Sequence, residues 1–173
     1  MTYILPFNNI EVVITQGYNG PWTHRKIRAN TDQSYSSDFA LPVGTEVTAA
    51  REGIVKLVYD MGDSVYRGYD FSEGSKFIAN MVNISHDDGT IASYQHFEKG
   101  SVSSRLKEGD FVKQSQVIGR TGLSGWVGPI PHLHFMVYEE VPFQLNGLIV
   151  RAMKTLPVKF DDYDGELEHG LLK

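Results

Sequence analysis

The chain has 173 residues, of which 41% are hydrophobic and 12% aromatic, a composition that fits a packed domain and excludes a disordered chain. Its 16 basic and 21 acidic residues give a net charge of −5. Five of the acids form one C-terminal run without a basic residue, so the rest of the chain is neutral and nucleic-acid binding is not expected; they are Asp161, Asp162, Asp164, Glu166 and Glu168. The absence of cysteine excludes disulfide scaffolds, thiol proteases and cysteine-ligated metal sites, which leaves histidine and carboxylate as metal ligands.

The N-terminal segment, Met1 to Phe7, carries no charged leader and no long apolar run. Nowhere does the sequence approach the roughly 20 apolar residues that a membrane-spanning helix needs. We therefore expect neither a signal peptide nor a transmembrane segment in these 173 residues.

Short β-rich segments bounded by glycine and other turn residues follow one another along the chain, and no window has a sustained helical period. This pattern predicts a mainly β, single domain over residues 1–173, built on an antiparallel sheet as a sandwich or barrel. The expected strands are Ile10–Ile14, Glu46–Ala50, Ile54–Tyr59, Met81–Ser85, Ile91–His96, Phe111–Ile118 and Leu133–Tyr138. Two long irregular segments, Met61–Ala79 and Arg120–Pro131, are candidates for the walls of a binding groove, although the first could equally be a surface insertion.

The motif His132-Leu133-His134 stands where a glycine-rich loop enters an expected strand. Side chains at positions i and i+2 of a strand point to the same face, about 7 Å apart along the chain. Both imidazoles could therefore serve one metal site. On this motif alone, a purely structural role is at least as well supported.

Two further elements carry polar side chains near expected strands. In Tyr94-Gln95-His96 the first and third residues would share a strand face, and Asp38 precedes the apolar segment Phe39-Ala40-Leu41. Taken singly, His96 could be a solvated strand residue and Asp38 could cap a turn.

Together these segments resemble the M23 peptidases, the lysostaphin- and LytM-like zinc endopeptidases that cut peptide cross-links in bacterial cell walls. The resemblance lies in Asp38 to Ala50, Tyr94-Gln95-His96 and His132-Leu133-His134-Phe135, in that order. It is supported by Asn80 to Gly89 and by Gly109 to Gly119, and it extends from about Gln16 to Tyr138.

The resemblance implies a site that binds one Zn²⁺ ion. Asp38 and His134 match family zinc ligands, and His96 and His132 match the two non-ligand catalytic histidines. The family usually has a histidine four residues before the aspartate, but Ser34 occupies that position. The upstream His24, in Thr23-His24, is therefore expected as the third ligand.

A zinc ion with three protein ligands keeps a position for water and lowers its pKa towards 7. Either His96 or His132 could then accept the proton while the other stabilises the oxyanion, and the sequence does not assign the two roles. Tyr94 is expected to orient substrate or simply to pack.

The resemblance further implies hydrolysis of a stem or cross-bridge peptide of peptidoglycan, in the bacterial cell envelope or outside the cell. The oligomeric state stays open. The motif-bearing core would span about residues 16–138, with 139–173 as a C-terminal extension whose acidic run forms a surface appendage. His86 is expected to be structural and His169 solvated.

Two alternatives belong to other functional classes. Glu108 to Gly119 also resembles the half-barrel motif of lipoyl and biotinyl carrier domains, but no lysine attachment signature accompanies it. The stronger alternative is a catalytically inactive M23-like module that binds cell-wall peptide or regulates another hydrolase. The retention of Asp38, His96, His132 and His134 argues for the enzyme.

Overall fold

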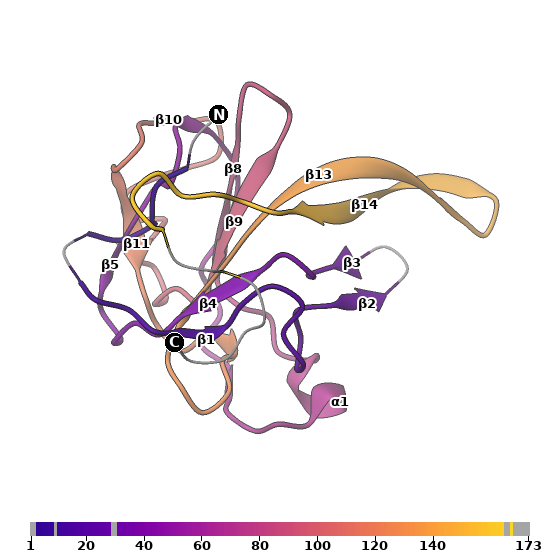
Figure 1. Cartoon of the computed structure of the whole chain (residues 1–173), viewed down its shortest axis with the longest axis horizontal. Coiled ribbons are helices and arrows are strands. Elements are labelled where there is room, and N and C mark those ends of the chain that lie inside the picture. The colour runs from indigo at the N-terminus through magenta and orange to yellow at the C-terminus, as the bar shows by residue number, and fades with distance from the viewer. Residues whose placement is uncertain (1–2, 9, 29–30, 165–166, 168–173) are drawn as a thin grey trace.

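The structure, a computed structural model, describes residues 3–8, 10–28, 31–164 and 167, with only the backbone described at 27 and 28. It is mainly β, as predicted, and its large sheet is mostly antiparallel (Figure 1). The strands are β1 (Ile14–Gln16), β2 (Lys26–Arg28), β3 (Thr31–Asp32), β4 (Ser37–Phe39), β5 (Glu46–Thr48), β6 (Gly53–Tyr59), β7 (Val65–Tyr66), β8 (Met81–Ser85), β9 (Ile91–Gln95), β10 (Phe111–Val112), β11 (Val117–Arg120), β12 (Gly125–Trp126), β13 (Leu133–Leu145) and β14 (Leu148–Leu156). The one helix among the described residues is the short α1 (Phe71–Gly74).

The large sheet runs in the order β10-β6-β8-β9-β13-β14-β3-β2, and β4 pairs with both β1 and β13. The start of β13 is therefore flanked by two strands: Leu133–Phe135 pair with β4 on one side, and His134–Tyr138 pair with β9 on the other. Because β13 carries His134 and β4 carries Asp38, this central position brings two predicted site residues next to each other.

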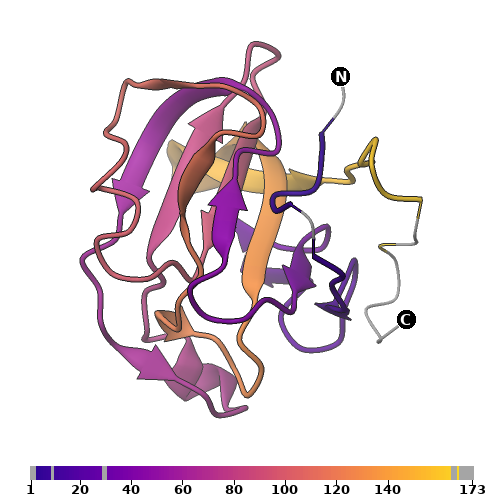
Figure 2. The ribbon, with the colours of Figure 1, turned by 90° about the vertical axis from the view of Figure 1, so that its left-hand side faces the viewer.

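The hydrophobic core lies between the large sheet and the two-stranded ladder of β5 and β11 (Figure 2). Val47 and Ile118 from the ladder share one buried cluster with Val82, Ile84 and Ala92 from the sheet. Complete burial of each valine or isoleucine side chain in this cluster stabilises the fold by about 1.5–3 kcal/mol. This packing fixes the sheet on which the site is built.

Most expected strands are confirmed, and two are corrected. Residues Ile10 to Val13 lie outside any strand, and β1 begins only at Ile14. The expected strand Phe111–Ile118 is two strands, because the chain turns at Ser115, whose φ is 65°, and β10 and β11 pair with different partners.

β13 and β14 form a long hairpin that projects from the body of the molecule (Figure 1). Its turn is Asn146-Gly147, with φ of 48° and 82°, values typical of the left-handed residues of a tight hairpin turn. β14 was not among the strands expected from the sequence, although Asn-Gly between two β-rich runs is a strong hairpin signal. At the start of β14, Leu148, Ile149 and Val150 follow one another without a polar residue between them, so the apolar/polar alternation that marks a half-buried strand is absent there.

The described part of the C-terminal segment packs on the body, which corrects the expected surface appendage. Phe160 and Leu167 belong to the main core cluster. Asp162 accepts a hydrogen bond from the Leu5 backbone N–H, and the Asp161 N–H donates to the Tyr3 carbonyl. Glu166, Glu168 and His169 lie outside the described residues.

Among the residues with a described structure, no helix has the length and apolar character to cross a membrane.

Candidate metal centre

One row of side chains crosses five neighbouring strands and forms the floor of a cleft. Cross-strand register places Asp38 opposite both Gln16 and His134, and His134 opposite Gln95, which in turn faces Met81. Residues opposite each other in a sheet project from the same face. All five line one cleft of about 670 Å³, so the sheet register alone brings an acid and an imidazole together.

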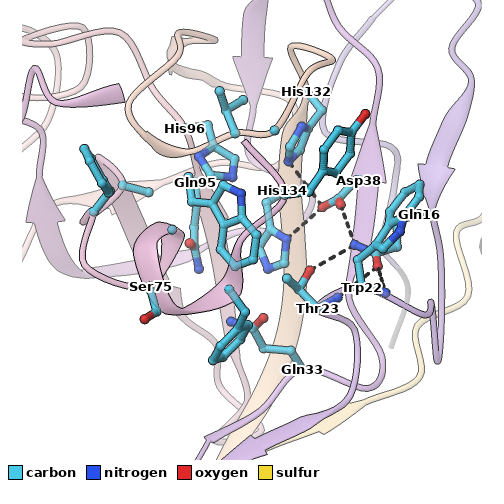
Figure 3. A pocket seen from close by; sticks show the side chains of 18 of the residues that line it. Gln16, Trp22, Thr23, Gln33, Asp38, Ser75, Gln95, His96, His132 and His134 are labelled. Atoms are coloured by element: carbon cyan, nitrogen blue, oxygen red, sulfur yellow. Dashed lines mark hydrogen bonds and ion pairs between the residues drawn. The ribbon is translucent and has the colours of Figure 1, made fainter. Parts of the chain in front are cut away.

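Asp38 and His134 are both buried, with 6% and 5% of their surfaces exposed. The His134 Nδ1 lies 2.8 Å from the Asp38 Oδ1, and Figure 3 shows Asp38 between Gln16 and His134. A carboxylate at this depth needs a compensating positive charge or hydrogen bonds.

His24 reaches the same carboxylate from the loop between β1 and β2. Its ring is fully buried, and its Nε2 lies 3.2 Å from the Asp38 Oδ1. Its Nδ1 lies 2.8 Å from the Gly17 carbonyl oxygen, and because a carbonyl only accepts, Nδ1 carries the proton and Nε2 keeps its lone pair. That Nε2 is a buried nitrogen without a hydrogen-bond partner among the described residues.

Ser34, at the position where a ligand histidine is usual in the resembling family, lies in a local turn instead. Its backbone N–H and its hydroxyl both donate to the Asp32 Oδ1, at 2.9 and 2.6 Å. Among the described residues, the cluster with metal-ligand spacing consists of His24, Asp38 and His134. The structure thus brings together the three residues that were expected as ligands.

Burial and charge act in opposite directions on the pKa values of this cluster. Burial alone would raise the pKa of Asp38, but the neighbouring imidazoles of His24 and His132 and the hydrogen bond from His134 hold it well below its usual range. Burial lowers the pKa of His24, but the negative charge of Asp38, together with smaller contributions that include the hydrogen bond to the Gly17 carbonyl, outweighs burial, and the net direction of the shift is upward. The pKa of His134 is lowered, chiefly by burial. The acid is therefore ionised and attracts protons or a cation.

His132 enters the cleft just before β13, on the same side as His134, as the i, i+2 spacing predicted. Its Nε2 lies 3.6 Å from the Asp38 Oδ1, and its Nδ1 lies 2.9 Å from the Ile130 carbonyl oxygen. The carbonyl accepts a hydrogen bond from the Nδ1–H group, so in the neutral imidazole the Nε2 lone pair faces the cluster.

His96 lies beside His132, with 4.7 Å between the ring centroids. Its Nδ1 lies 2.7 Å from the Ser124 carbonyl oxygen, which again leaves Nε2 as the nitrogen able to accept a proton. Burial and the neighbouring His132 and His134 lower the pKa of His96 to about 3, so this imidazole is neutral near pH 7. Neutral imidazoles can take up a proton during a reaction.

The backbone at His96 is unusual, with a φ of 72°. Few residues other than glycine adopt this left-handed conformation, and it is often found at functional sites. The His96 N–H donates to the Asn80 carbonyl and its own carbonyl accepts from the Gly122 N–H, and these bonds hold the turn. β9 therefore ends at Gln95, one residue earlier than expected.

Tyr94 is not in the cleft, which corrects its expected role in orienting substrate. Its side chain is fully buried in the core, and its hydroxyl accepts a hydrogen bond of 2.9 Å from the Ala50 N–H. The expectation that Tyr94 and His96 share a face failed because the left-handed turn at His96 breaks the strand alternation. Of the two roles considered for Tyr94, the structure shows packing.

The two irregular segments predicted from the sequence form part of the walls of the cleft, and Trp22 from the loop between β1 and β2 lines it as well. Tyr69, Phe71 and Ile78 contribute from Met61–Ala79, and Trp126 and Ile130 contribute from Arg120–Pro131. The segments are joined by the parallel pairing of β12 with β7 and by the Trp126 Nε1–H, which donates to the Gly68 carbonyl at 2.8 Å. This wall is largely apolar and aromatic, as is usual for a site that binds an organic ligand.

His86, which was expected to be structural, lies outside the cleft and makes structural contacts. The His86 Nδ1 lies 2.7 Å from the Glu52 carbonyl oxygen, and its ring packs edge-on against Tyr3.

Two residues of the floor, Gln16 and Gln95, were not singled out from the sequence. Only their cross-strand register with Asp38 and His134 reveals them.

The donor set of the cluster fits zinc. Zinc–nitrogen bonds of 2.0–2.1 Å in a tetrahedral site put neighbouring donors about 3.3 Å apart. The Asp38 Oδ1 lies 3.2 Å from the His24 Nε2 and 2.8 Å from the His134 Nδ1, and the three ligand atoms all lie within 4.8 Å of one another. The His24 Nε2, which has no hydrogen-bond partner among the described residues, would also gain a partner if a cation were bound. Two imidazoles and one carboxylate in an open cleft define a metallopeptidase type of zinc site.

The chain belongs to Peptidase family M23, whose model matches residues 32–144, more than half of the sequence. His24 and Gln16 precede the matched range. The chain is 35% identical over 112 residues to the peptidoglycan DD-endopeptidase ShyC of Vibrio cholerae serotype O1, covering 65% of this chain and 20% of that protein. It is 34% identical over 122 residues to lysostaphin of Staphylococcus simulans, covering 69% of this chain and 20% of that protein. The chain thus spans about a fifth of the length of these curated relatives.

Solved structures support the same fold. The catalytic domain of the prophage-encoded M23 protein EnpA from Enterococcus faecalis, solved as a point mutant, superimposes with a TM-score of 0.53 at 26% identity, covering 85% of this chain and 93% of that one. A zinc-containing peptidase from Vibrio cholerae superimposes with a TM-score of 0.52 at 23% identity, covering 91% of this chain and 41% of that one.

Proposed function

We propose that this chain is a zinc-dependent endopeptidase that hydrolyses peptide bonds of bacterial peptidoglycan, in a stem peptide or a cross-bridge. The observation that carries the proposal is the cluster of His24, Asp38 and His134 with two further histidines beside it in one cleft. The similarity to ShyC and to lysostaphin supports peptidoglycan as the substrate.

In this proposal His24, Asp38 and His134 hold the ion through Nε2, Oδ1 and Nδ1, and the Nδ1 proton of His134, which faces Asp38 here, is released when the ion binds. Zinc, when bound, supplies Lewis acidity for the scissile carbonyl and makes water a stronger acid. His96 contributes a neutral imidazole and His132 a second imidazole, and the Nε2 atoms of both are free of the backbone contacts made by Nδ1. One of them accepts a proton, and the other, when it is protonated, donates a hydrogen bond to the developing negative charge.

The walls of the cleft select the substrate in this proposal. Trp22, Tyr69 and Ile78 expose 54%, 73% and 61% of their surfaces and line the same cleft as the histidines. Apolar and aromatic walls suit small aliphatic side chains and the faces of peptide groups. Peptidoglycan lies outside the cytoplasmic membrane, so the site of action we propose is the cell envelope or the extracellular space.

The direct test is the release of soluble peptide fragments from purified cell walls of different cross-bridge chemistry. We expect release by the zinc-loaded chain, loss after chelation and recovery after zinc is restored. New free amino groups in the product would identify peptide-bond cleavage. A folded, zinc-loaded chain that releases nothing from any of these walls would contradict the proposal.

A further inference from the structure

Gln16 lies between the Asp38 carboxylate and the loop that carries His24, and it is only 3% exposed. Its Nε2 donates to the Asp38 Oδ2 and to the Thr23 Oγ1, each at 3.0 Å. Its Oε1 accepts from the backbone N–H groups of Trp22 and Thr23, at 3.0 and 3.1 Å. A primary amide has two N–H donors and one oxygen with two lone pairs, so all four hydrogen-bonding positions of this side chain are used (Figure 3).

The orientation of this amide is dictated by its partners. The two backbone N–H groups can only donate, so they must face the amide oxygen, and the NH₂ group must then face Asp38. This contact occupies the Oδ2 of Asp38 and leaves Oδ1 turned towards His24, His132 and His134. One amide therefore determines which carboxylate oxygen faces the histidines.

The same amide also fixes the loop that supplies His24. Its oxygen binds the N–H groups of the two residues directly before His24. The loop is closed tightly around it: a Cβ on Gly20 would stand 2.3 Å from the Gln16 Cγ, a distance that no side chain tolerates without displacement. Because His24 lies far upstream of Asp38 in the sequence, its position depends on this loop conformation.

We propose that Gln16 is a positioning residue of the metal centre, which couples the ligand His24 to the ligand Asp38 through one buried amide. The proposal rests on the zinc site proposed above. Residues that hydrogen-bond a metal ligand orient it, and their loss commonly weakens metal affinity about 10–100-fold. Gln16 differs from such residues in holding one ligand directly and the chain segment of another at the same time.

The test is Gln16→Met, which keeps an unbranched side chain of similar length and removes all four hydrogen bonds. We expect the zinc affinity, measured by competition with a chromophoric chelator, to fall about 10–100-fold. We also expect the visible spectrum of the Co²⁺-substituted protein to change, because this spectrum reports the ligand geometry. Thr23→Val is the matched control: it removes one contact of the same amide and leaves the Asp38 contact in place, so its affinity and spectrum should stay close to those of the wild type.

A second variant keeps the proposal testable if Gln16→Met does not fold. Gln16→Glu retains oxygens that accept from Trp22 and Thr23 but has no N–H for Asp38, so the Co²⁺ spectrum should still change. An unchanged zinc affinity and an unchanged Co²⁺ spectrum in a folded Gln16→Met, or an unchanged spectrum in Gln16→Glu, would overturn the role of Gln16. If instead the wild type binds no zinc, the zinc site itself fails, which is a different outcome.

Discussion

The site has four histidines and one aspartate, of which two lie on central strands and three lie on loops. Different interactions hold the two groups in place. Asp38 on β4 and His134 on β13 are fixed by the hydrogen-bond ladder between their strands, which aligns them as direct partners. Each loop histidine is held by one ring N–H bound to a backbone carbonyl: that of Gly17 for His24, Ser124 for His96 and Ile130 for His132. The sheet gives the centre its rigid half, and local loop geometry completes it.

The largest effect on zinc affinity and activity is expected from a change to one of the strand-borne residues. His134→Ala removes a donor from the centre of the sheet, and we expect the zinc affinity to fall by on the order of 10³-fold, because one of three ligands is lost. Hydrolysis of cell walls should fall below detection. Chelator competition measures the first effect and fragment release the second, and a variant that kept both zinc and activity would break the assignment of His134.

An intermediate effect is expected from a loop residue that does not bind zinc. In His96→Asn the imidazole is lost, while asparagine tolerates the left-handed backbone at this position. We expect turnover to fall about 10²–10⁴-fold, the range of general acid–base catalysis, with zinc affinity and thermal stability unchanged.

The contrast with His134→Ala makes this prediction decisive. If His96→Asn lost zinc as severely, His96 would be a ligand, and the division between the three ligands and the two proton carriers would be wrong at this residue. Zinc titration of both variants, side by side with activity, separates the two outcomes.

The smallest effect on activity is expected at Tyr94, one strand position from the cleft floor. Tyr94→Phe leaves the buried Ala50 N–H without its acceptor, which should cost about 1–3 kcal/mol of the free energy of unfolding. kcat and KM should stay unchanged, because the hydroxyl lies in the core. Urea unfolding and steady-state kinetics measure the two quantities, and Tyr69→Phe, at a residue with 73% of its surface exposed, is the control that should leave stability unchanged. A raised KM in Tyr94→Phe would restore the role in substrate binding.

In the strand-borne half, the strand of His134 could be predicted from the sequence, because strand periodicity is a local property. No strand was expected at Asp38, which lies on β4 and was selected through the resemblance to the M23 peptidases. The spacing of His132 and His134 gave a shared face, and the flanking glycine and turn residues placed the strand. The walls were predicted for a similar reason, since Met61–Ala79 and Arg120–Pro131 lack any strand pattern. The long β13–β14 hairpin was missed although its Asn146-Gly147 turn is visible in the sequence.

The loop-borne half depends on contacts between segments that are distant in the sequence. The choice of His24 over Ser34 came from a resemblance to other proteins, and only the fold shows that His24 reaches Asp38. The left-handed backbone at His96 has no local signal, and it reversed the expected orientation of Tyr94 relative to the cleft. Gln16 became visible only through its register with Asp38.

The most direct test of the account is a crystal structure of the zinc-loaded protein with the metal located by anomalous scattering. We predict one zinc ion bound by the His24 Nε2, the Asp38 Oδ1 and the His134 Nδ1 at about 2.0–2.2 Å, with His96 and His132 nearby and unbound. An ion ligated by His96 or His86, or a site without His24, would contradict it.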